Sequence, residues 1–419
     1  MDGNKGKLSL IVVVFTKKIS KDMKKLFYIS LFFSLVLASC NKKQDENVLP
    51  EAQYLVQSEL VGEFTGAQIK ARYANNTEVA PFLGLLPLNT VKVYNITYNT
   101  VDVSGNAIIA SGALIVPVES KPYALVSYQH GTITADEEAP SNYQPNSESY
   151  TSGTLFSAAG YVVSMPDYIG YGASKNLAHP YEHAASLASA SRDMLRASRE
   201  FCARNNVALN NQLFLAGYSE GGYASMALHK LLETSHHDEF TVTASIPGAG
   251  AYNKTAFAKY VVSKNEKLSF INAYLWVLDT YNDVYKLNRS FDAYINEPYA
   301  SQLANATPAI GIQIEVEQNP QLLFKQSFLD GVRDETDAAF LNATKDNDIY
   351  NWTPKAPIRM FHGTADDFVP FFNSQNAYDA MRANGATQVE LIPIEGGNHF
   401  TSIATYTLGL FNYLAQFNQ

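Results

Sequence analysis

The sequence predicts an α/β fold with a mostly parallel central sheet, helices on both faces and a helical cap insertion. Short apolar segments alternate with stretches of helical spacing, a β-hairpin precedes them, and one long interval interrupts the alternation. Strands that alternate with helices favour parallel pairing, because each helix returns the chain across a face of the sheet. We expect the apolar strands at residues 123–129, 161–167, 212–218, 240–248, 356–363 and 388–395.

The hairpin is expected over residues 90–118. β-branched and polar residues alternate on both sides of the turn at 104–106, and this period of two is typical of an antiparallel pair. A short helix is expected around residues 67–73 and a long one over residues 185–205, where the spacing of apolar residues is helical.

The interruption lies between the fourth and fifth apolar strands. Residues 254–352 contain helical stretches rich in Tyr and Phe, such as 268–287 and 319–332. A loop of this length without secondary structure would be improbable. We therefore expect a helical insertion that caps the sheet, and we expect most of its aromatic residues to pack the insertion's own small core.

The N-terminal segment is typical of an exported protein. A basic pair follows Met23, an apolar run begins at Leu26, and small residues precede Cys40. We expect residues 1–39 to be a signal peptide, with Met23 as a candidate for the true start of the chain.

The end of this segment resembles the lipobox of bacterial lipoproteins, which implies that Cys40 is lipidated and begins the mature protein. Residues 40–52 are polar and charged, so we expect a tether. The expected location is the cell envelope, with the lipid anchored at the outer membrane or cell surface of a bacterium. Two alternatives stay open: a signal peptide with an incidental cysteine, and a membrane-spanning anchor. The apolar run of about fourteen residues is short for the roughly twenty needed to span hydrocarbon.

Charge and cysteine content limit the function classes. Removal of residues 1–39 takes away seven basic and two acidic residues, which leaves 24 Lys and Arg against 38 Asp and Glu, a net charge of −14. A nucleic-acid partner is therefore not expected. Once Cys40 is lipidated, only Cys202 remains. No intramolecular disulfide is then possible, and stability must come from the core.

Ser219 lies between glycines directly after an apolar run. The segment "GYSEG" at 217–221 matches the G-x-S-x-G pattern of a nucleophile elbow, and a helical stretch follows it. Glycines suit this turn because the nucleophile's backbone is strained and neighbouring side chains would collide. The N-terminus of the helix directs amides toward the serine, so the Glu220 N–H can stabilise an oxyanion. The alternative is a serine that merely occupies a glycine-rich turn.

A serine nucleophile needs a base, and the base needs an orienting acid. Asp366 follows the penultimate strand, and His399 follows the last one. Asp367 is an alternative acid, and His399 could instead be a capping or core histidine. We expect His362, at the end of a strand, to make a structural hydrogen bond.

Five segments in this order resemble the α/β-hydrolase-fold serine esterases and lipases, close to the secretory-lipase and prolyl-oligopeptidase-like branches. They are "YQHGT", "MPDYIGYGAS", "GYSEGG", "HGTADDFVP" and "GGNHF". The resemblance spans roughly residues 90–417 and implies a hydrolase domain over 53–419. Its Ser, acid, His order implies a triad of Ser219, Asp366 and His399, and its H-G-x-x-D pattern favours Asp366 over Asp367. Fungal secretory lipases usually carry disulfides, which this chain cannot form, so their substrate class is not carried over.

The resemblance also implies the surroundings of the nucleophile. An amide after the "HG" pair faces the serine in this family, which makes Thr132 the expected second oxyanion donor beside Glu220. Tyr168, Tyr171 and Tyr218 are candidates to line the substrate pocket.

Other polar residues are expected to be structural. Asp167 precedes Ser219 in the chain and is expected to brace its loop, and His130 is expected to order the oxyanion loop. His236 and His237 beside two acidic residues suggest a metal site, yet adjacent polar residues in a loop are usually solvated. We expect no metal and no organic cofactor.

The expected activity is hydrolysis of carboxylic esters through an acyl-enzyme on Ser219, with a small-molecule or glycan ester as substrate. The alternatives are a serine peptidase of the prolyl-oligopeptidase type, an acyltransferase, and a non-catalytic binding protein that kept the fold. Medium-chain acyl esters, acetylated or feruloylated glycans and peptides all agree with the sequence.

Overall fold

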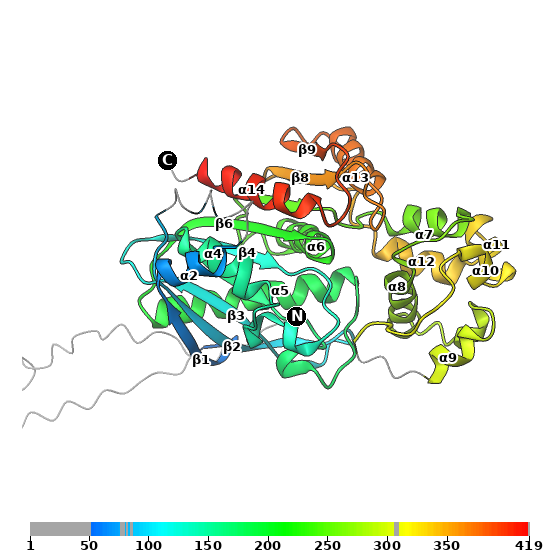
Figure 1. Ribbon diagram of the computed structural model, residues 1–419, viewed down its shortest axis with the longest axis horizontal. Helices are drawn as coiled ribbons and strands as arrows, with labels where there is room; N and C mark the ends of the chain where they lie inside the picture. The colour runs from blue at the N-terminus through cyan, green and yellow to red at the C-terminus, as the bar shows by residue number, and fades with distance from the viewer. Residues whose placement is uncertain (1–51, 76–79, 81–82, 84–86, 306–309, 418–419) are drawn as a thin grey trace, which may run out of the picture. The chain divides into compact units, whose positions relative to one another are not determined.

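The computed structural model describes residues 52–75, 80, 83, 87–305 and 310–417, which belong to one compact unit (Figure 1). The predicted signal peptide, the alternative start at Met23 and the lipidated Cys40 lie outside the described residues.

A mixed, mostly parallel sheet of nine strands forms the centre of this unit, in the order β1-β2-β3-β5-β4-β6-β7-β8-β9. The first three pairings, from β1 to β5, are antiparallel, and the other five are parallel. Together with the helices on both faces, this confirms the predicted fold class. The strands are β1 (Leu55–Phe64), β2 (Val91–Val101), β3 (Ala107–Pro117), β4 (Tyr123–Gln129), β5 (Tyr161–Pro166), β6 (Leu209–Tyr218), β7 (Ala244–Gly248), β8 (Ile358–Gly363) and β9 (Val389–Ile394).

The predicted hairpin corresponds to β2 and β3, which pair from Val91 with Pro117 to Val101 with Ala107. Strand β1 was not predicted. Its side chains are mostly exposed, and its pairing with β2 is shifted at two places. Because the backbone of β2 holds this strand and no apolar face is buried, no alternation marks it in the sequence.

Helices cover both faces of the sheet. The α-helices are α2 (Gly66–Arg72), α4 (Thr154–Ala158), α5 (Ala184–Arg204), α6 (Glu220–Ser235), α7 (Lys254–Ser263), α8 (Ile271–Val284), α9 (Tyr299–Asn305), α10 (Pro320–Leu323), α11 (Gln326–Arg333), α12 (Ala338–Asp346), α13 (Phe372–Ala383) and α14 (Ser402–Ala415). The single-turn elements are η1 (Asp136–Glu138), η2 (Pro140–Asn142), η3 (Ser149–Gly153), η4 (Gly172–Ser174) and η5 (Phe291–Ala293).

The core is divided between the two faces of the sheet. On one face, α2, α4 and α14 bury residues such as Ile69, Phe156 and Leu410 against the strands. On the other face, α5, α6 and α13 bury Leu195, Leu232 and other apolar residues. Both faces of the parallel strands are therefore covered, which agrees with their nearly continuous burial.

The chain between β7 and β8 forms α7 to α12, which lie together at one end of the unit (Figure 1). Their aromatic residues form one buried cluster that includes Phe257, Tyr274, Trp276, Phe324 and Phe328. Most of these aromatic residues therefore pack against one another.

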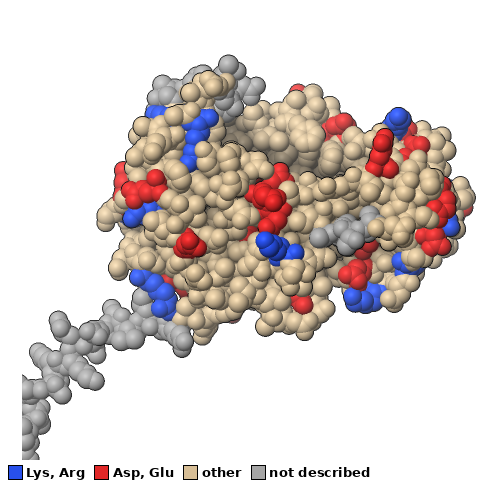
Figure 2. Space-filling view, turned by 60° about the horizontal axis from the view of Figure 1, so that its bottom comes forward, with Lys and Arg blue, Asp and Glu red and all other residues tan. Residues whose placement is uncertain are grey.

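One face of the protein carries its charge in small separate groups. On the face shown in Figure 2, Lys and Arg alternate with Asp and Glu, and uncharged surface separates them. Within the described ranges, no helix has the length and apolar character needed to cross a membrane. Cys202 is a buried free thiol on α5, and burial raises its pKa to about 12.

Candidate active site

Ser219 occupies a sharp turn between β6 and α6. Its backbone has φ of 60° and ψ of −123°, a left-handed conformation that L-residues rarely adopt. The turn is also crowded, because a Cβ at Gly217 would approach the carbonyl oxygen of Gln129 to 2.4 Å, and one at Gly221 to 2.1 Å. Glycine is required at both positions, and the strand, turn and helix expected from the sequence are present.

Two hydrogen-bond contacts connect Ser219 to His399 and His399 to Asp366. The His399 Nε2 is 2.9 Å from Ser219 Oγ, and its Nδ1 is 2.8 Å from Asp366 Oδ2. The three residues follow β6, β9 and β8, whose carboxyl ends meet at the same edge of the parallel sheet. This geometry allows the imidazole to accept the serine proton while its Nδ1–H remains bonded to the carboxylate.

Asp366 is held in its ionised form by its neighbours. Its Oδ1 accepts from the N–H groups of Phe368 at 2.9 Å and Val369 at 2.8 Å. Burial alone would raise the pKa of Asp366, but hydrogen bonds from His362 and His399 and their charges lower it to about 2. Asp367 is exposed, so the adjacent carboxyl does not share this environment.

His362 lies behind the acid rather than at the nucleophile. Its Nδ1 is 2.7 Å from Ser374 Oγ, and its Nε2 is 2.8 Å from the Val369 carbonyl and 3.3 Å from Asp366 Oδ2. It therefore braces the loop that carries Asp366, in keeping with the structural hydrogen bond expected for it.

The two expected oxyanion donors belong to segments next to Ser219. Glu220 is the first residue of α6, whose opening amides have no partner within the helix. In the loop after β4, the Gly131 N–H donates to the Glu148 carboxylate at 2.7 Å. A Cβ at Gly131 would lie 3.9 Å from Ser219 Cβ, so this loop runs beside the nucleophile, and Thr132 is its next residue.

A segment that the sequence analysis did not single out supports both candidate donors. It comprises residues 179–183. The Tyr181 hydroxyl is 2.9 Å from Thr132 Oγ1, and the His179 Nε2 is 2.8 Å from Glu220 Oε1. No sequence motif marks this segment, because its two contacts join residues 49 and 41 positions apart.

The same segment contacts the helices between β7 and β8. The Tyr181 ring stacks on the indole of Trp276 in α8, with centroids 4.2 Å apart and an angle of 6° between the planes. His179 lies 5.4 Å from that indole, edge to face. The loop that touches the candidate oxyanion donors is therefore packed directly against α8.

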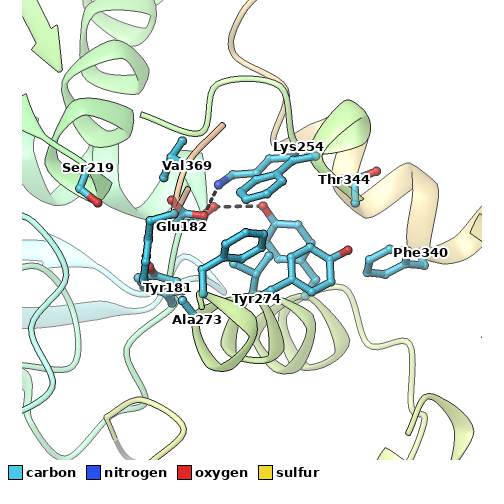
Figure 3. Close-up of a pocket in the computed structure, with 14 residues that line it drawn as sticks. Tyr181, Glu182, Ser219, Lys254, Ala273, Tyr274, Phe340, Thr344 and Val369 are labelled. Carbon is cyan, nitrogen blue, oxygen red and sulfur yellow. Dashed lines mark hydrogen bonds and ion pairs between the residues drawn. The ribbon is translucent and has the colours of Figure 1, made fainter. Parts of the chain in front are cut away.

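A narrow cavity opens at Ser219 and extends among α7, α8 and α12 (Figure 3). Aromatic side chains form much of its wall, which also contains a buried ion pair between Lys254 and Glu182. Burial raises the pKa of Glu182 and lowers that of Lys254, while their mutual attraction opposes both shifts. The lining residues are Tyr181, Glu182, Ser219, Lys254, Phe257, Phe270, Ala273, Tyr274, Val277, Tyr281, Phe340, Thr344, Phe368 and Val369.

The three tyrosines proposed as pocket residues do not line this cavity. Their rings are buried, and each hydroxyl donates to a backbone carbonyl: Tyr168 to His130 at 3.0 Å, Tyr171 to Ile133 at 2.9 Å, and Tyr218 to His399 at 2.7 Å. They hold the loops of the site from behind, a role that the sequence pattern does not distinguish from pocket lining.

Asp167 and the histidine pair lie away from the nucleophile. Asp167 is buried and accepts from Ser111 Oγ at 2.6 Å and from the Ser141 N–H at 2.8 Å, so it braces the loop after β5. His236 contacts Arg192, and no group of His, Cys, Asp and Glu among the described residues has the arrangement of a metal site.

Comparison with known proteins relates the chain to ester hydrolases. A family model described as secretory lipase matches residues 150–408, more than half of the chain. A search of curated proteins gave no match. Three solved structures illustrate the structural similarity.

The first is a Legionella pneumophila protein provisionally assigned as a hydrolase, with a TM-score of 0.78 and 26% identity over 87% of this chain and 98% of that chain. The second is the rice cell wall degrading esterase LipA from Xanthomonas oryzae, with a TM-score of 0.74 and 25% identity over 86% and 95%. Candida antarctica lipase A shares the fold, with a TM-score of 0.59 and 18% identity over 84% and 78%. The chain is a carboxylic ester hydrolase and belongs to the secretory lipase family.

Proposed function

We propose that the chain hydrolyses carboxylic esters through an acyl-enzyme on Ser219, with His399 as the base and Asp366 as the orienting acid. The observation that carries this proposal is the continuous contact from Asp366 through the imidazole to Ser219 Oγ, at a strained turn that opens on a cavity. The amides of Glu220 and Thr132 are the proposed oxyanion donors.

The reaction proceeds in two acyl transfers. The Ser219 hydroxyl proton moves to His399 Nε2 as Oγ bonds to the carbonyl carbon, and the two amides hold the oxyanion. The bond to the alcohol oxygen then breaks, and the alcohol leaves with the proton from Nε2. Water repeats the attack: one proton passes to Nε2, its oxygen bonds to the carbonyl carbon, and Ser219 recovers its proton as the acid leaves.

Turnover of a para-nitrophenyl ester tests this proposal. Ser219→Ala should lower kcat by at least about 10⁴-fold, because the nucleophile and its base act as a unit. Ser235→Ala, an exposed serine at the end of the same helix, is the matched control and should retain full turnover. Turnover that survives in Ser219→Ala would contradict the assignment.

The other candidate functions are outcomes of parallel measurements. A fluorophosphonate probe that labels Ser219 excludes a passive binding protein. Peptide anilides hydrolysed faster than esters would favour the peptidase, and ester formation from an added alcohol would favour an acyltransferase. We propose a small-molecule or glycan ester as the substrate; the similar Xanthomonas oryzae protein is described as degrading rice cell wall.

We also propose that the protein is exported and anchored in a bacterial envelope through lipidated Cys40, as the signal sequence indicates. Cells fed a labelled fatty acid should incorporate it into the wild type and into a Cys202→Ser control, but not into Cys40→Ser. Label retained by Cys40→Ser would overturn the anchor. Expression from Met23 should suffice for export.

A further inference from the structure

We propose that the cavity beside Ser219 selects acyl groups that carry a hydroxyl remote from the ester carbonyl. This inference rests on the proposed function, because it takes the cavity to be the acyl site of Ser219. The observation behind it is a buried ion pair in a wall rich in aromatic side chains (Figure 3).

The wall itself suits an apolar and narrow acyl body. Seven aromatic side chains from α7, α8, α12 and the neighbouring loops line it, including Phe257, Tyr281 and Phe340. Such rings bury flat or extended hydrocarbon groups well. An unsubstituted alkyl chain would need no polar group in this wall.

Lys254 and Glu182 place charged groups in this wall, and a hydrocarbon acyl chain would not need them. Their side chains are 3% and 7% exposed, and both residues line the same cavity as Ser219. Figure 3 shows the two side chains directed toward each other. Replacing a buried ion pair by apolar residues is often neutral or stabilising, so its presence facing an acyl chain calls for a specific reason.

The ion pair can form more hydrogen bonds than its neighbours in the protein supply. The ammonium of Lys254 has three N–H donors, and within the described part of the chain its partners are Glu182 Oε2 and the face of the Tyr223 ring, 4.2 Å away. Among the described side chains, the Glu182 carboxylate accepts a hydrogen bond from Lys254 alone. A hydroxyl group, which both donates and accepts, complements this pair.

The pair is also held in a fixed position in the wall of the cavity. Glu182 has a left-handed backbone with φ of 50°, and the Tyr281 hydroxyl donates to its carbonyl oxygen at 3.1 Å. Lys254 opens α7, whose N-cap Asn253 accepts from the Ala256 N–H at 3.0 Å. A hydroxyl on the acyl group would therefore meet donors and acceptors that need little rearrangement.

A second polar atom on the wall supports the same conclusion independently. The hydroxyl of Tyr274 is buried and has no hydrogen-bond partner among the described residues, although Tyr274 lines the cavity. An unpartnered buried hydroxyl is costly. A ligand oxygen in the cavity would relieve that cost, whereas a plain alkyl chain would not.

The experiment compares matched esters on the purified protein. One arm pairs ethyl para-hydroxycinnamate with ethyl cinnamate, and the other pairs octanoate esters with and without a terminal hydroxyl. The wild type should favour the hydroxylated ester in at least one arm by about tenfold in kcat/KM, the size of one or two good hydrogen bonds. The arm with the larger ratio identifies the aromatic or the alkyl source of the hydroxyl.

Two variants and a control separate selectivity from structural support. Lys254→Met with Glu182→Gln should bring the ratio close to one. Lys259→Met with Glu335→Gln removes an exposed ion pair between α7 and the loop after α11, and it should keep the wild-type ratio. If the first variant does not fold, Tyr274→Phe decides, because it removes only an unpartnered hydroxyl and should lower the ratio at least about threefold.

The outcomes distinguish this inference from the proposed function. Ester turnover that depends on Ser219, with a ratio at or below one in both arms, would overturn the inference alone. A ratio that persists in the folded double variant, or in Tyr274→Phe when that variant decides, would overturn it as well. Absence of Ser219-dependent turnover on any ester would overturn the proposed function and with it this selectivity.

Discussion

At the scale of single residues, the backbone conformation of Ser219 explains why glycine occupies positions 217 and 221. The left-handed conformation exposes Oγ above the sheet, and the close approach of Gln129 leaves no room for a side chain at Gly217 or Gly221. These requirements are local in sequence, so the pattern "GYSEG" between an apolar run and a helical stretch predicted the turn. The residues that complete the site with Ser219 could be predicted only from the order of the acid and the histidine along the chain.

The choice between the two adjacent carboxyls can be tested directly. Asp366→Asn should lower kcat by about 10⁴-fold, because the amide cannot hold the histidine in the required tautomer. Asp367→Asn should retain kcat within about twofold, since that side chain is exposed and outside the contact with His399. Steady-state kinetics with a para-nitrophenyl ester measures both, and the reverse pattern would assign the acid to Asp367.

At the scale of elements, residues 179–183 connect the core to the inserted helices. Tyr181 contacts Thr132 through its hydroxyl and Trp276 through its ring. The position of α8 is therefore linked to the loop that carries a candidate oxyanion donor. A motif search cannot find such a segment, because its importance arises from packing and not from spacing.

Removal of the Tyr181 hydroxyl should affect the rate more than substrate binding. Tyr181→Phe keeps the stacked ring but loses the contact with Thr132, so kcat should fall about tenfold with KM within about twofold. Tyr285→Phe is a suitable control, because its hydroxyl donates to Asp346, at the end of α12. A change confined to KM, or no change, would mean that the hydroxyl does not position the loop.

The strands show where sequence patterns suffice. β4 was predicted residue for residue at 123–129, because both of its faces are buried and its apolar run is continuous. For β7 the expected range 240–248 began four residues too early. β1 was missed because its mostly exposed side chains carry no alternation. The three tyrosines predicted for the pocket do not line the cavity beside Ser219, since a loop tyrosine can face either the cavity or the core.

At the scale of the whole molecule, buried titratable groups set the response to acid. Burial lowers the pKa of His183 to about 4, although the charge of Asp346 partly opposes the shift. Its neutral form is therefore favoured in the folded protein. This contribution to stability is fully present above pH 6.5 and is lost as the pH falls from 6.5 toward 4.

Unfolding in urea at two pH values tests this coupling. Between pH 7 and pH 4.5, His183 should account for a loss of about 2 kcal/mol in the free energy of unfolding. His183→Gln should lose that much less than the wild type over the same interval, since the amide does not titrate. Equal losses in the two proteins would show that other groups cause the acid response.

The thiol of Cys202 makes the integrity of the fold observable in a different way. It is buried on α5 against the strands, with a pKa raised to about 12, so it is unreactive while the helix stays packed. In a protein whose Cys40 carries its lipid or is replaced by serine, a thiol-specific reagent can reach only this sulfur, and only when α5 opens. The rate of labelling therefore measures how often the core opens spontaneously, and the natural sequence needs no added probe for this measurement.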